Sequence, residues 1–148
     1  MAGFSLLEML VVLVLIASAT LLAMAAFTGG LRGAQLQAAA KEVAAQLRFT
    51  RALAISSGRP QSFVLDTQTR RWQAANGRHG QLPDIGMLDF TSARELQHST
   101  VKGEVRFFPD GAASGGRVRL AANGGGWDVN VAWLTGEVRV QRMQQAMP

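Results

Sequence analysis

The stretch from Phe4 to Phe27 reads FSLLEMLVVLVLIASATLLAMAAF and carries a single charged residue, Glu8. A helix of this length spans about 36 Å, more than the roughly 30 Å of a bilayer's hydrocarbon core. A cleaved secretory signal would instead place basic residues before a shorter apolar core and small residues at a cleavage site after it. The stretch therefore predicts a transmembrane helix over residues 4–27 rather than a secretory signal peptide.

Beyond this segment the helical pattern continues over residues 28–58. Leu36, Ala40, Val43 and Leu47 recur at steps of three or four, and the charged residues fall largely off that stripe. This spacing predicts an amphipathic helix that continues the first one, about 50 residues in all. The stretch 56–60, SSGRP, predicts its end, because glycine suits the left-handed position after a helix and proline cannot continue it.

From residue 59 the apolar pattern changes to that of strands. Short alternating runs bounded by glycine, proline and aspartate predict a β-rich head over residues 59–148, antiparallel and of five to seven strands. Residues 76–93 are rich in glycine, proline and aspartate and predict a surface loop. We expect an α+β fold in which the amphipathic half of the helix covers one face of the sheet. The predicted strands are 62–65 and 70–75 as a hairpin, then 104–108, 116–122, 127–134 and 138–140.

The net charge and the absence of cysteine limit the ligands and reactions that the chain could support. The 148 residues include 15 lysines and arginines against 10 aspartates and glutamates, a formal net charge of +5, and every basic residue lies at or beyond Arg32. A basic surface permits contact with nucleic acid, lipid headgroups or acidic proteins, and equally describes a solvated surface without a ligand. The absence of cysteine excludes disulfides, thiolate zinc sites and cysteine nucleophiles.

Signals of catalysis are weak. His79 and His98 fall in predicted loops and have no second histidine or acid at a catalytic or metal-binding spacing, and no phosphate loop or serine-hydrolase motif occurs. We therefore predict no enzyme, no catalytic residue, no metal site and no cofactor. Four aspartates with oxygen ligands suited to calcium lie outside any EF-hand-like run: Asp66, Asp84, Asp89 and Asp110.

The three tryptophans are Trp72, Trp127 and Trp133. They could serve as stacking platforms for a ligand, but tryptophans at strand spacing more often pack in a core or on a domain surface. We predict the second role, with Trp127 and Trp133 on the apolar face of one strand.

Gly3, Phe4 and Glu8 form the first motif with chemical meaning. A carboxylate within a membrane helix is costly, about 2.5–3.5 kcal/mol for aspartate at the helix centre and less near an end. Cleavage of the Gly3–Phe4 bond would create a compensating positive charge, the free α-amino group of Phe4. In a filament, Glu8 of one subunit could meet Phe4 of the next. Alternatively, Glu8 extends to the nearby headgroups.

The segment 3–16, GFSLLEMLVVLVLI, resembles the type III signal sequence of type IV pilins and type II secretion pseudopilins. The resemblance implies that residues 1–3 are a leader, that a prepilin peptidase cuts after Gly3 and methylates the new amino group of Phe4, and that Glu8 acts in assembly. The leader departs from the family pattern, since Met1 and Ala2 supply none of the usual basic residues before the glycine.

The segments 107–120, FFPDGAASGGRVRL, and 127–140, WDVNVAWLTGEVRV, resemble the β-domain of H-type minor pseudopilins, a domain shared with FimT-like minor pilins. The resemblance implies a pilin-like protein held by a single pass in the bacterial inner membrane, with its C-terminal domain in the periplasm. It also implies a place near the pseudopilus tip, linking other minor pseudopilins to the major pseudopilin and so driving exoprotein export.

An arginine-rich stretch leaves a second function open. Arg117 and Arg119 share one face of a predicted strand, and Arg106 and Arg139 are expected on nearby strands. Such a row suits phosphate contacts, and FimT-like pilins that bind DNA during uptake are similar in using Gly-Arg-x-Arg near the C-terminus. The alternative function is therefore a DNA-binding minor pilin of a type IV pilus. The structural alternative is a solvated sheet edge, where charges discourage aggregation.

Overall fold

The computed structural model describes residues 3–92, 101–122 and 124–143. Two compact units divide the chain, Met1–Ala34 and Gln35–Pro148, and each is described by itself. The second unit is called the head below. The predicted leader falls partly on residues 1–2, outside the described residues.

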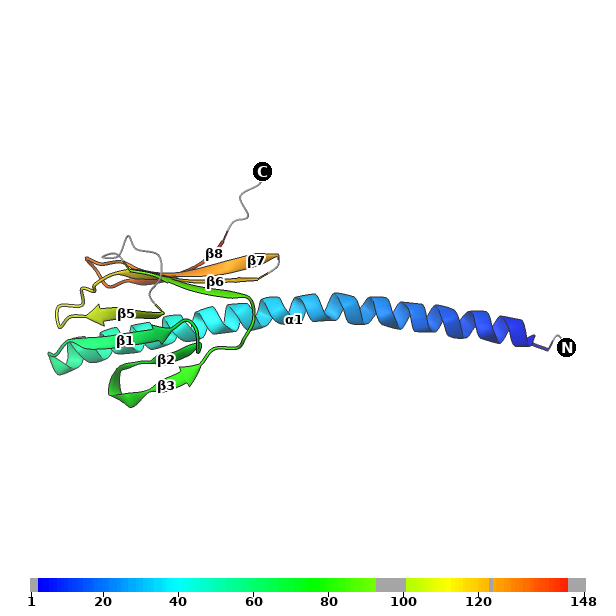
Figure 1. Ribbon diagram of the computed structural model, residues 1–148, viewed down its shortest axis with the longest axis horizontal. Coiled ribbons are helices and arrows are strands. Elements are labelled where there is room, and N and C mark those ends of the chain that lie inside the picture. The colour runs from blue at the N-terminus through cyan, green and yellow to red at the C-terminus, as the bar shows by residue number, and fades with distance from the viewer. Residues whose placement is uncertain (1–2, 93–100, 123, 144–148) are drawn as a thin grey trace. The chain divides into compact units, whose positions relative to one another are not determined.

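One helix, α1, runs from Leu6 to Ser57 over 52 residues (Figure 1). Its first turn is capped by Ser5, whose hydroxyl oxygen accepts a hydrogen bond from the Glu8 backbone N–H at 3.2 Å. It ends one residue before Gly58, which has a φ of 64°, the left-handed conformation that glycine adopts at low cost. The predicted length of about 50 residues is confirmed, whereas the position along α1 where the membrane segment ends stays a prediction.

The N-terminal part of α1 is apolar on all sides. Every side chain from residue 6 to residue 27 is exposed, and the helix is long and apolar enough to cross a membrane by length and composition. Its hydroxyl groups are satisfied within the helix, since Ser18 donates to the Val14 carbonyl and Thr20 to the Ile16 carbonyl, both at 2.7 Å. In a bilayer, where no water can satisfy these groups, such internal bonds are required.

The head holds two four-stranded antiparallel sheets, with strand orders β3-β2-β1-β5 and β4-β6-β7-β8. The predicted hairpin is present as β1 and β2, paired with Leu65 opposite Trp72. A short 3₁₀ helix, η1 (Ala75–Gly77), precedes β3. The strand bounds are β1 Gln61–Asp66, β2 Arg71–Gln73, β3 His79–Gln81, β4 Met87–Thr91, β5 Lys102–Phe107, β6 Gly116–Ala122, β7 Gly125–Val131 and β8 Val138–Arg142.

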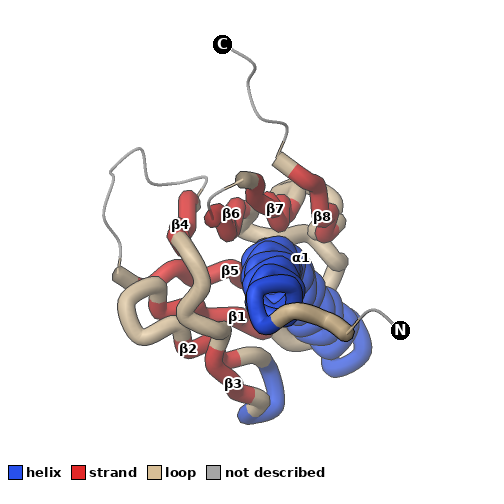
Figure 2. The backbone as a smooth tube through the Cα atoms, turned by 90° about the vertical axis from the view of Figure 1, so that its right-hand side faces the viewer, coloured by secondary structure: helices blue, strands red, loops and turns tan. Residues whose placement is uncertain are grey.

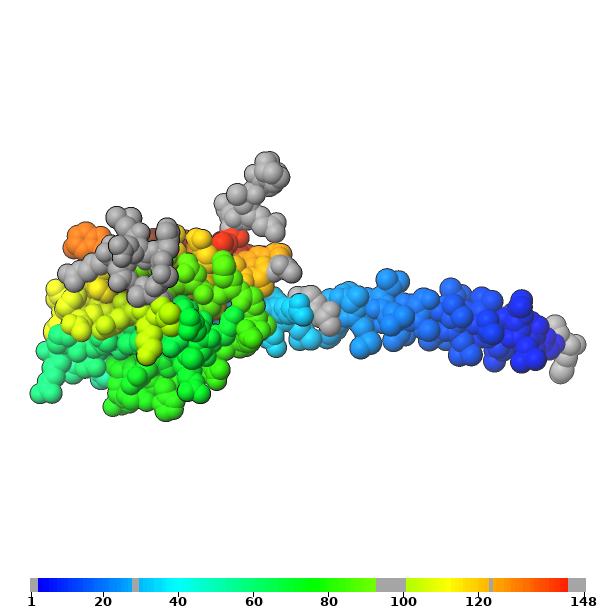
Figure 3. Space-filling model, in the orientation of Figure 1, coloured from blue at the N-terminus to red at the C-terminus, as the bar shows by residue number. Residues whose placement is uncertain are grey.

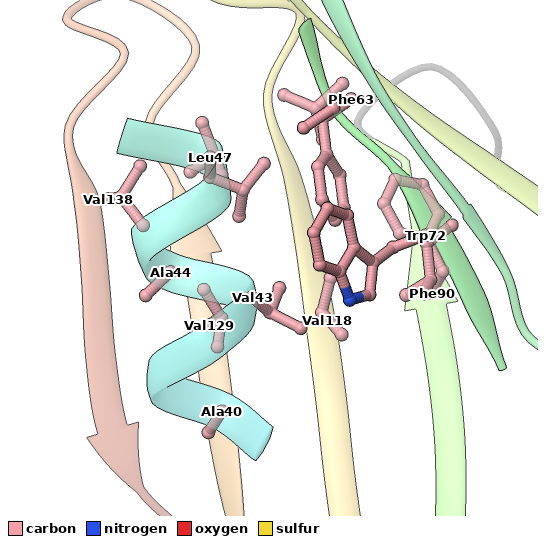
Figure 4. Close-up of a cluster of buried hydrophobic side chains, with 14 of the residues drawn as sticks. Ala40, Val43, Ala44, Leu47, Phe63, Trp72, Phe90, Val118, Val129 and Val138 are labelled. Atoms are coloured by element: carbon pink, nitrogen blue, oxygen red, sulfur yellow. The ribbon is translucent and has the colours of Figure 1, made fainter. Parts of the chain in front are cut away.

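Within the head, the C-terminal part of α1 lies between the two sheets, which Figure 2 shows end-on. Small side chains on α1 let the sheets pack close to the helix. Among them, Ala40 and Ala44 are fully buried. Figure 4 shows Val138 on one side of this helix and Phe63 on the other. All belong to a single hydrophobic cluster, so α1 and both sheets share one core.

Two sequence-based expectations are wrong. Residues 76–93 are not one loop, because they contain β3 and β4, and β4 contributes the buried Phe90. The described part of the chain forms eight strands in two sheets, not five to seven in one, so α1 covers a face of each sheet.

Gly103 on β5 is required by a close approach between the two sheets. A Cβ added there would lie 2.1 Å from two ring carbons of Phe90, which belongs to the other sheet. Because any larger residue would displace this ring, the contact explains a glycine inside a strand.

Candidate functional site

The predicted processing site lies in an open segment just before α1. Gly3 and Phe4 belong to no helix or strand, the Phe4 side chain is 78% exposed, and a Cβ added at Gly3 would meet no atom within 4 Å. A peptidase needs access to the backbone that it cuts, and the Gly3–Phe4 bond lies in an exposed segment outside any helix or strand. Cleavage and methylation there stay predictions.

Glu8 stands in the first turn of α1. Four unsatisfied N–H groups and the aligned peptide dipoles make this end of a helix partly positive, which stabilises a nearby carboxylate. Ser5 to Glu8 also has the S-x-x-E spacing of a capping box, and the Glu8 N–H to Ser5 Oγ bond is one half of that motif. Ser5 was not predicted as a functional residue, although its spacing from Glu8 is a local signal that the sequence contains. The role of Glu8 in assembly stays a prediction.

Arg117, Arg119 and Arg139 lie on one face of the β4-β6-β7-β8 sheet, called the arginine face below. The pairing register of the strands places the residues of this face in two rows that cross the sheet. One row places Arg117 and Arg139 on either side of Asn130, and the next places Arg119 between Asp89 and Asp128. The predicted shared face of Arg117 and Arg119 is therefore confirmed, and Arg139 lies on a nearby strand of the same sheet, as expected.

Each of these arginines already has a polar partner. Arg119 Nε lies 3.0 Å from Asp128 Oδ1, and Arg139 forms two bonds to Glu137, at 2.9 and 3.0 Å. Arg117 Nε donates to Asn130 Oδ1 at 2.7 Å. The hydrogen bond that Arg139 donates to Glu137 lowers the pKa of Glu137, and the hydrogen bond that Arg119 donates to Asp128 raises the pKa of Arg119.

The charges of the arginine face balance. Its three arginines are matched by three carboxylates, those of Asp89, Asp128 and the neighbouring Glu137. A phosphate would have to compete with these carboxylates for the guanidinium groups, and the repulsion would weaken nucleic-acid binding. The geometry therefore favours a solvated, internally paired sheet face.

Arg106 does not belong to the arginine face. It lies on β5 in the other sheet, where it contacts Glu104 at 3.4 Å. The expectation that it extends the row is wrong, because strand periodicity gives the side of a strand but not the sheet to which the strand belongs.

The Glu137–Arg139 pair predicts a pH dependence of head stability. Because the folded pKa of Glu137 is lowered, its contribution is fully present above the unfolded value of about 4.3 and is lost as the pH falls through the folded pKa. Urea unfolding midpoints between pH 7 and pH 3 should therefore fall more for the wild type than for Glu137→Gln. Arg139→Gln should flatten the profile equally, and an unchanged profile in both variants would contradict the pairing.

Other candidate sites do not come together. Among the described residues no group of three or more histidine, cysteine, aspartate or glutamate side chains is placed to hold a metal ion. His79 lies on β3 rather than in a loop, and His98 falls outside the described residues. Trp72 is buried and donates to Glu42 Oε1 at 3.1 Å, which confirms a core role. Trp133 is exposed instead, because β7 ends at Val131.

The long N-terminal helix and the antiparallel sheets that share a core with its C-terminal part define a pilin-like protein. Two solved structures have this fold. The minor pseudopilin EpsH of the type 2 secretion system of Vibrio cholerae matches with a TM-score of 0.57 at 17% identity, covering 73% of this chain and 97% of that one. The type IV minor pilin FimU of Pseudomonas aeruginosa matches with a TM-score of 0.55 at 18% identity, covering 76% and 95%.

Sequence comparison separates the two classes that share this fold. The family model for the type II transport protein GspH matches residues 39–136. The type II secretion system protein H of Xanthomonas campestris pv. campestris is 49% identical over 146 residues, covering 99% of this chain and 86% of that protein. The chain belongs to the GspH family, and is therefore a minor pseudopilin of type II secretion, as the sequence resemblance predicts.

Proposed function

We propose that this chain is held in the inner membrane by the N-terminal part of α1, with its head in the periplasm. There it assembles near the tip of the pseudopilus and links the other minor pseudopilins to the major pseudopilin. The observation that carries the proposal is the combination of an exposed apolar helix with 49% identity to a type II secretion system protein H along almost the whole chain. The proposed work is to occupy a place in a filament and make contacts.

The shape of the N-terminal unit supports this role. A helix that is apolar on all sides must be covered either by lipid or by other helices. Before assembly lipid would cover it, and in a filament the equivalent helices of neighbouring subunits would replace the lipid. Processing at Gly3 by a prepilin peptidase would prepare the Phe4 amino group for the pairing with Glu8.

Deletion of the gene should abolish exoprotein secretion, measured as exoprotein in the culture supernatant, and leave DNA uptake and twitching unchanged. The wild-type gene should restore secretion. Gly3→Val should not, because a branched side chain at the scissile bond blocks cleavage, and mass spectrometry should show that residues 1–3 remain on the chain. Ala2→Ser, which keeps Gly3, should be processed and should secrete normally.

Normal secretion after deletion, together with loss of uptake or twitching, would contradict the proposal. That result would favour the alternative function, a DNA-binding minor pilin, and would make Arg117 and Arg119 the residues to test. Salt-sensitive DNA binding that Arg117→Ala and Arg119→Ala abolish would then be expected.

A further inference from the structure

The turn between β7 and β8 exposes two consecutive large apolar side chains. Trp133 is 66% exposed and Leu134 is 67% exposed. Single exposed apolar residues are common and need no explanation, whereas a group of them marks an interaction site. Tryptophan is also the residue type most enriched among those that dominate binding energies at protein interfaces.

Hydrogen bonds hold the backbone of this turn in place. The Ala132 N–H donates to the Glu137 carbonyl at 3.0 Å, and the Gly136 N–H donates to the Ala132 carbonyl at 2.8 Å. The carbonyl of Trp133 itself accepts from the Ala113 N–H at 2.9 Å. The two apolar side chains are therefore presented on an ordered backbone, which lowers the entropy that binding would cost.

Arg51 of α1 ties the turn to the helix and to a second loop. Its guanidinium donates to the Thr135 carbonyl and to the Gly111 carbonyl, both at 3.0 Å. Because these hydrogen bonds join Arg51 to the backbone of both loops, Arg51 positions the two loops relative to α1.

Two further exposed apolar residues lie at the same end of the head. A Cβ built on Gly111 would lie 3.4 Å from Ile55 Cδ1, and the Gly111 N–H donates to the Phe108 carbonyl at 2.9 Å. Ile55 is 47% exposed and Phe108 38%. In Figures 1 and 3 the end of α1 and the orange β7–β8 turn both lie at the left-hand end of the head, with a yellow segment between them. The apolar end patch, as used below, consists of Ile55, Phe108, Trp133 and Leu134.

The position of the patch argues against lipid as its occupant. The chain enters the head at Gln35, and Ile55 lies 20 residues further along α1, which is about 30 Å of helix. The patch is therefore at the far end of this helix from the point where the membrane segment joins the head. Two of the charged residues near it are already bonded, since Glu137 pairs with Arg139 and Arg51 donates to two backbone carbonyls, so an apolar protein surface suits the patch better than a charged one.

A second copy of the chain is also a poor occupant. A symmetric contact of patch on patch would point the two α1 segments in opposite directions, although both copies must insert into one membrane. A head-to-tail contact would need a second apolar surface, and beyond the patch the described head offers only Met87 and Val101 as exposed large hydrophobic residues.

We propose that the apolar end patch docks against an apolar surface on the head of a different pseudopilin in the same filament. In a filament of parallel helices anchored in one membrane, the C-terminal end of each helix faces the subunit assembled ahead of it. The patch would therefore contact the neighbour on the side away from the membrane. This inference rests on the proposed function and adds to it the contact surface and its chemistry.

Photocrosslinking in cells that secrete through the complete system tests the proposal. A benzophenone amino acid replaces Leu134 in the full chain, and replaces Met87, which is 58% exposed, in a matched control. Irradiation should join position 134 to another pseudopilin, identified by mass spectrometry, at a yield at least about tenfold above position 87. Trp133→Ser should lower that yield about tenfold or more, the loss expected for one dominant interface residue, and should reduce secretion. Met87→Ser should do neither.

Trp133→Ser and Met87→Ser each replace an exposed residue, so the amount of chain in the membrane and its N-terminal processing should stay unchanged. Equal yields at positions 134 and 87, or an adduct only between copies of this chain, would overturn the proposal. So would normal secretion by the double variant Trp133→Ser, Leu134→Ser in cells where deletion of the gene abolishes secretion. Normal secretion after the deletion itself would instead refute the proposed function.

Discussion

Phe63→Ala should lower the free energy of unfolding of the head by about 3–5 kcal/mol, a large part of the roughly 5–15 kcal/mol that stabilises a typical domain. Phe63 is fully buried on β1, and its ring stacks on Trp72 with the centroids 6.3 Å apart and the planes at 19°. It belongs to the single cluster in which α1 and both sheets meet. Removal of its ring would leave a cavity that this three-part core cannot fill.

Urea unfolding of the detergent-solubilised full chain, followed by tryptophan fluorescence, measures this loss. Phe63→Leu should cost less than Phe63→Ala because most of the volume is retained, and Met87→Ala at an exposed site should change the stability by about 0.5 kcal/mol or less. A loss below about 1 kcal/mol for Phe63→Ala would show that the core repacks. A large loss for Met87→Ala would show that β4 has a covering that the structure does not include.

Local signals predicted the helix well. Its stripe of Leu36, Ala40, Val43 and Leu47 is buried in the head, and its end follows from the glycine and proline of the stretch 56–60. These signals act within a few residues, so the sequence alone is sufficient to read them. The apolar run over residues 4–27 predicts a membrane segment in the same local way, and the structure shows a helix there that is long and apolar enough to cross a membrane.

The division of the strands into two sheets could not be predicted. It depends on pairings between distant segments, β1 with β5 and β4 with β6. β4 was missed because the glycine, proline and aspartate residues before it suggested a loop. Its own sequence, MLDFT, nevertheless alternates, and it places Phe90 in the core.

The same limit applies to the arginine-rich stretch. Alternation showed that Arg117 and Arg119 share a side of β6. Whether their charges are free to bind a phosphate depends on the residues opposite them, which the sequence alone does not identify. The register places Asn130 and Asp128 there, and these residues turn a candidate phosphate site into a paired surface. Trp133 was predicted on the apolar face of a strand, but β7 ends at Val131, so Trp133 lies exposed in the turn that follows.

Glu8→Gln should reduce secretion to the level of the gene deletion while the chain is still made, inserted and processed. Gln has nearly the same shape as Glu and also fits the capping-box position, so the cap from Ser5 should survive and only the charge is lost. Without that charge, the Phe4 amino group of a neighbouring subunit would have no carboxylate partner in a low-dielectric helix bundle. Exoprotein in the supernatant and the amount of processed chain in the membrane are the two measurements.

Ser5→Ala provides the matched control, because it removes the capping hydroxyl and keeps the carboxylate. Loss of a cap costs about 1 kcal/mol of helix stability, which a helix of 52 residues should tolerate, so secretion should remain close to the wild-type level. The opposite pattern, secretion by Glu8→Gln but not by Ser5→Ala, would contradict the pairing with Phe4. It would mean that the spacing from Ser5 to Glu8 exists to begin the helix, and that the negative charge of Glu8 has no part in assembly.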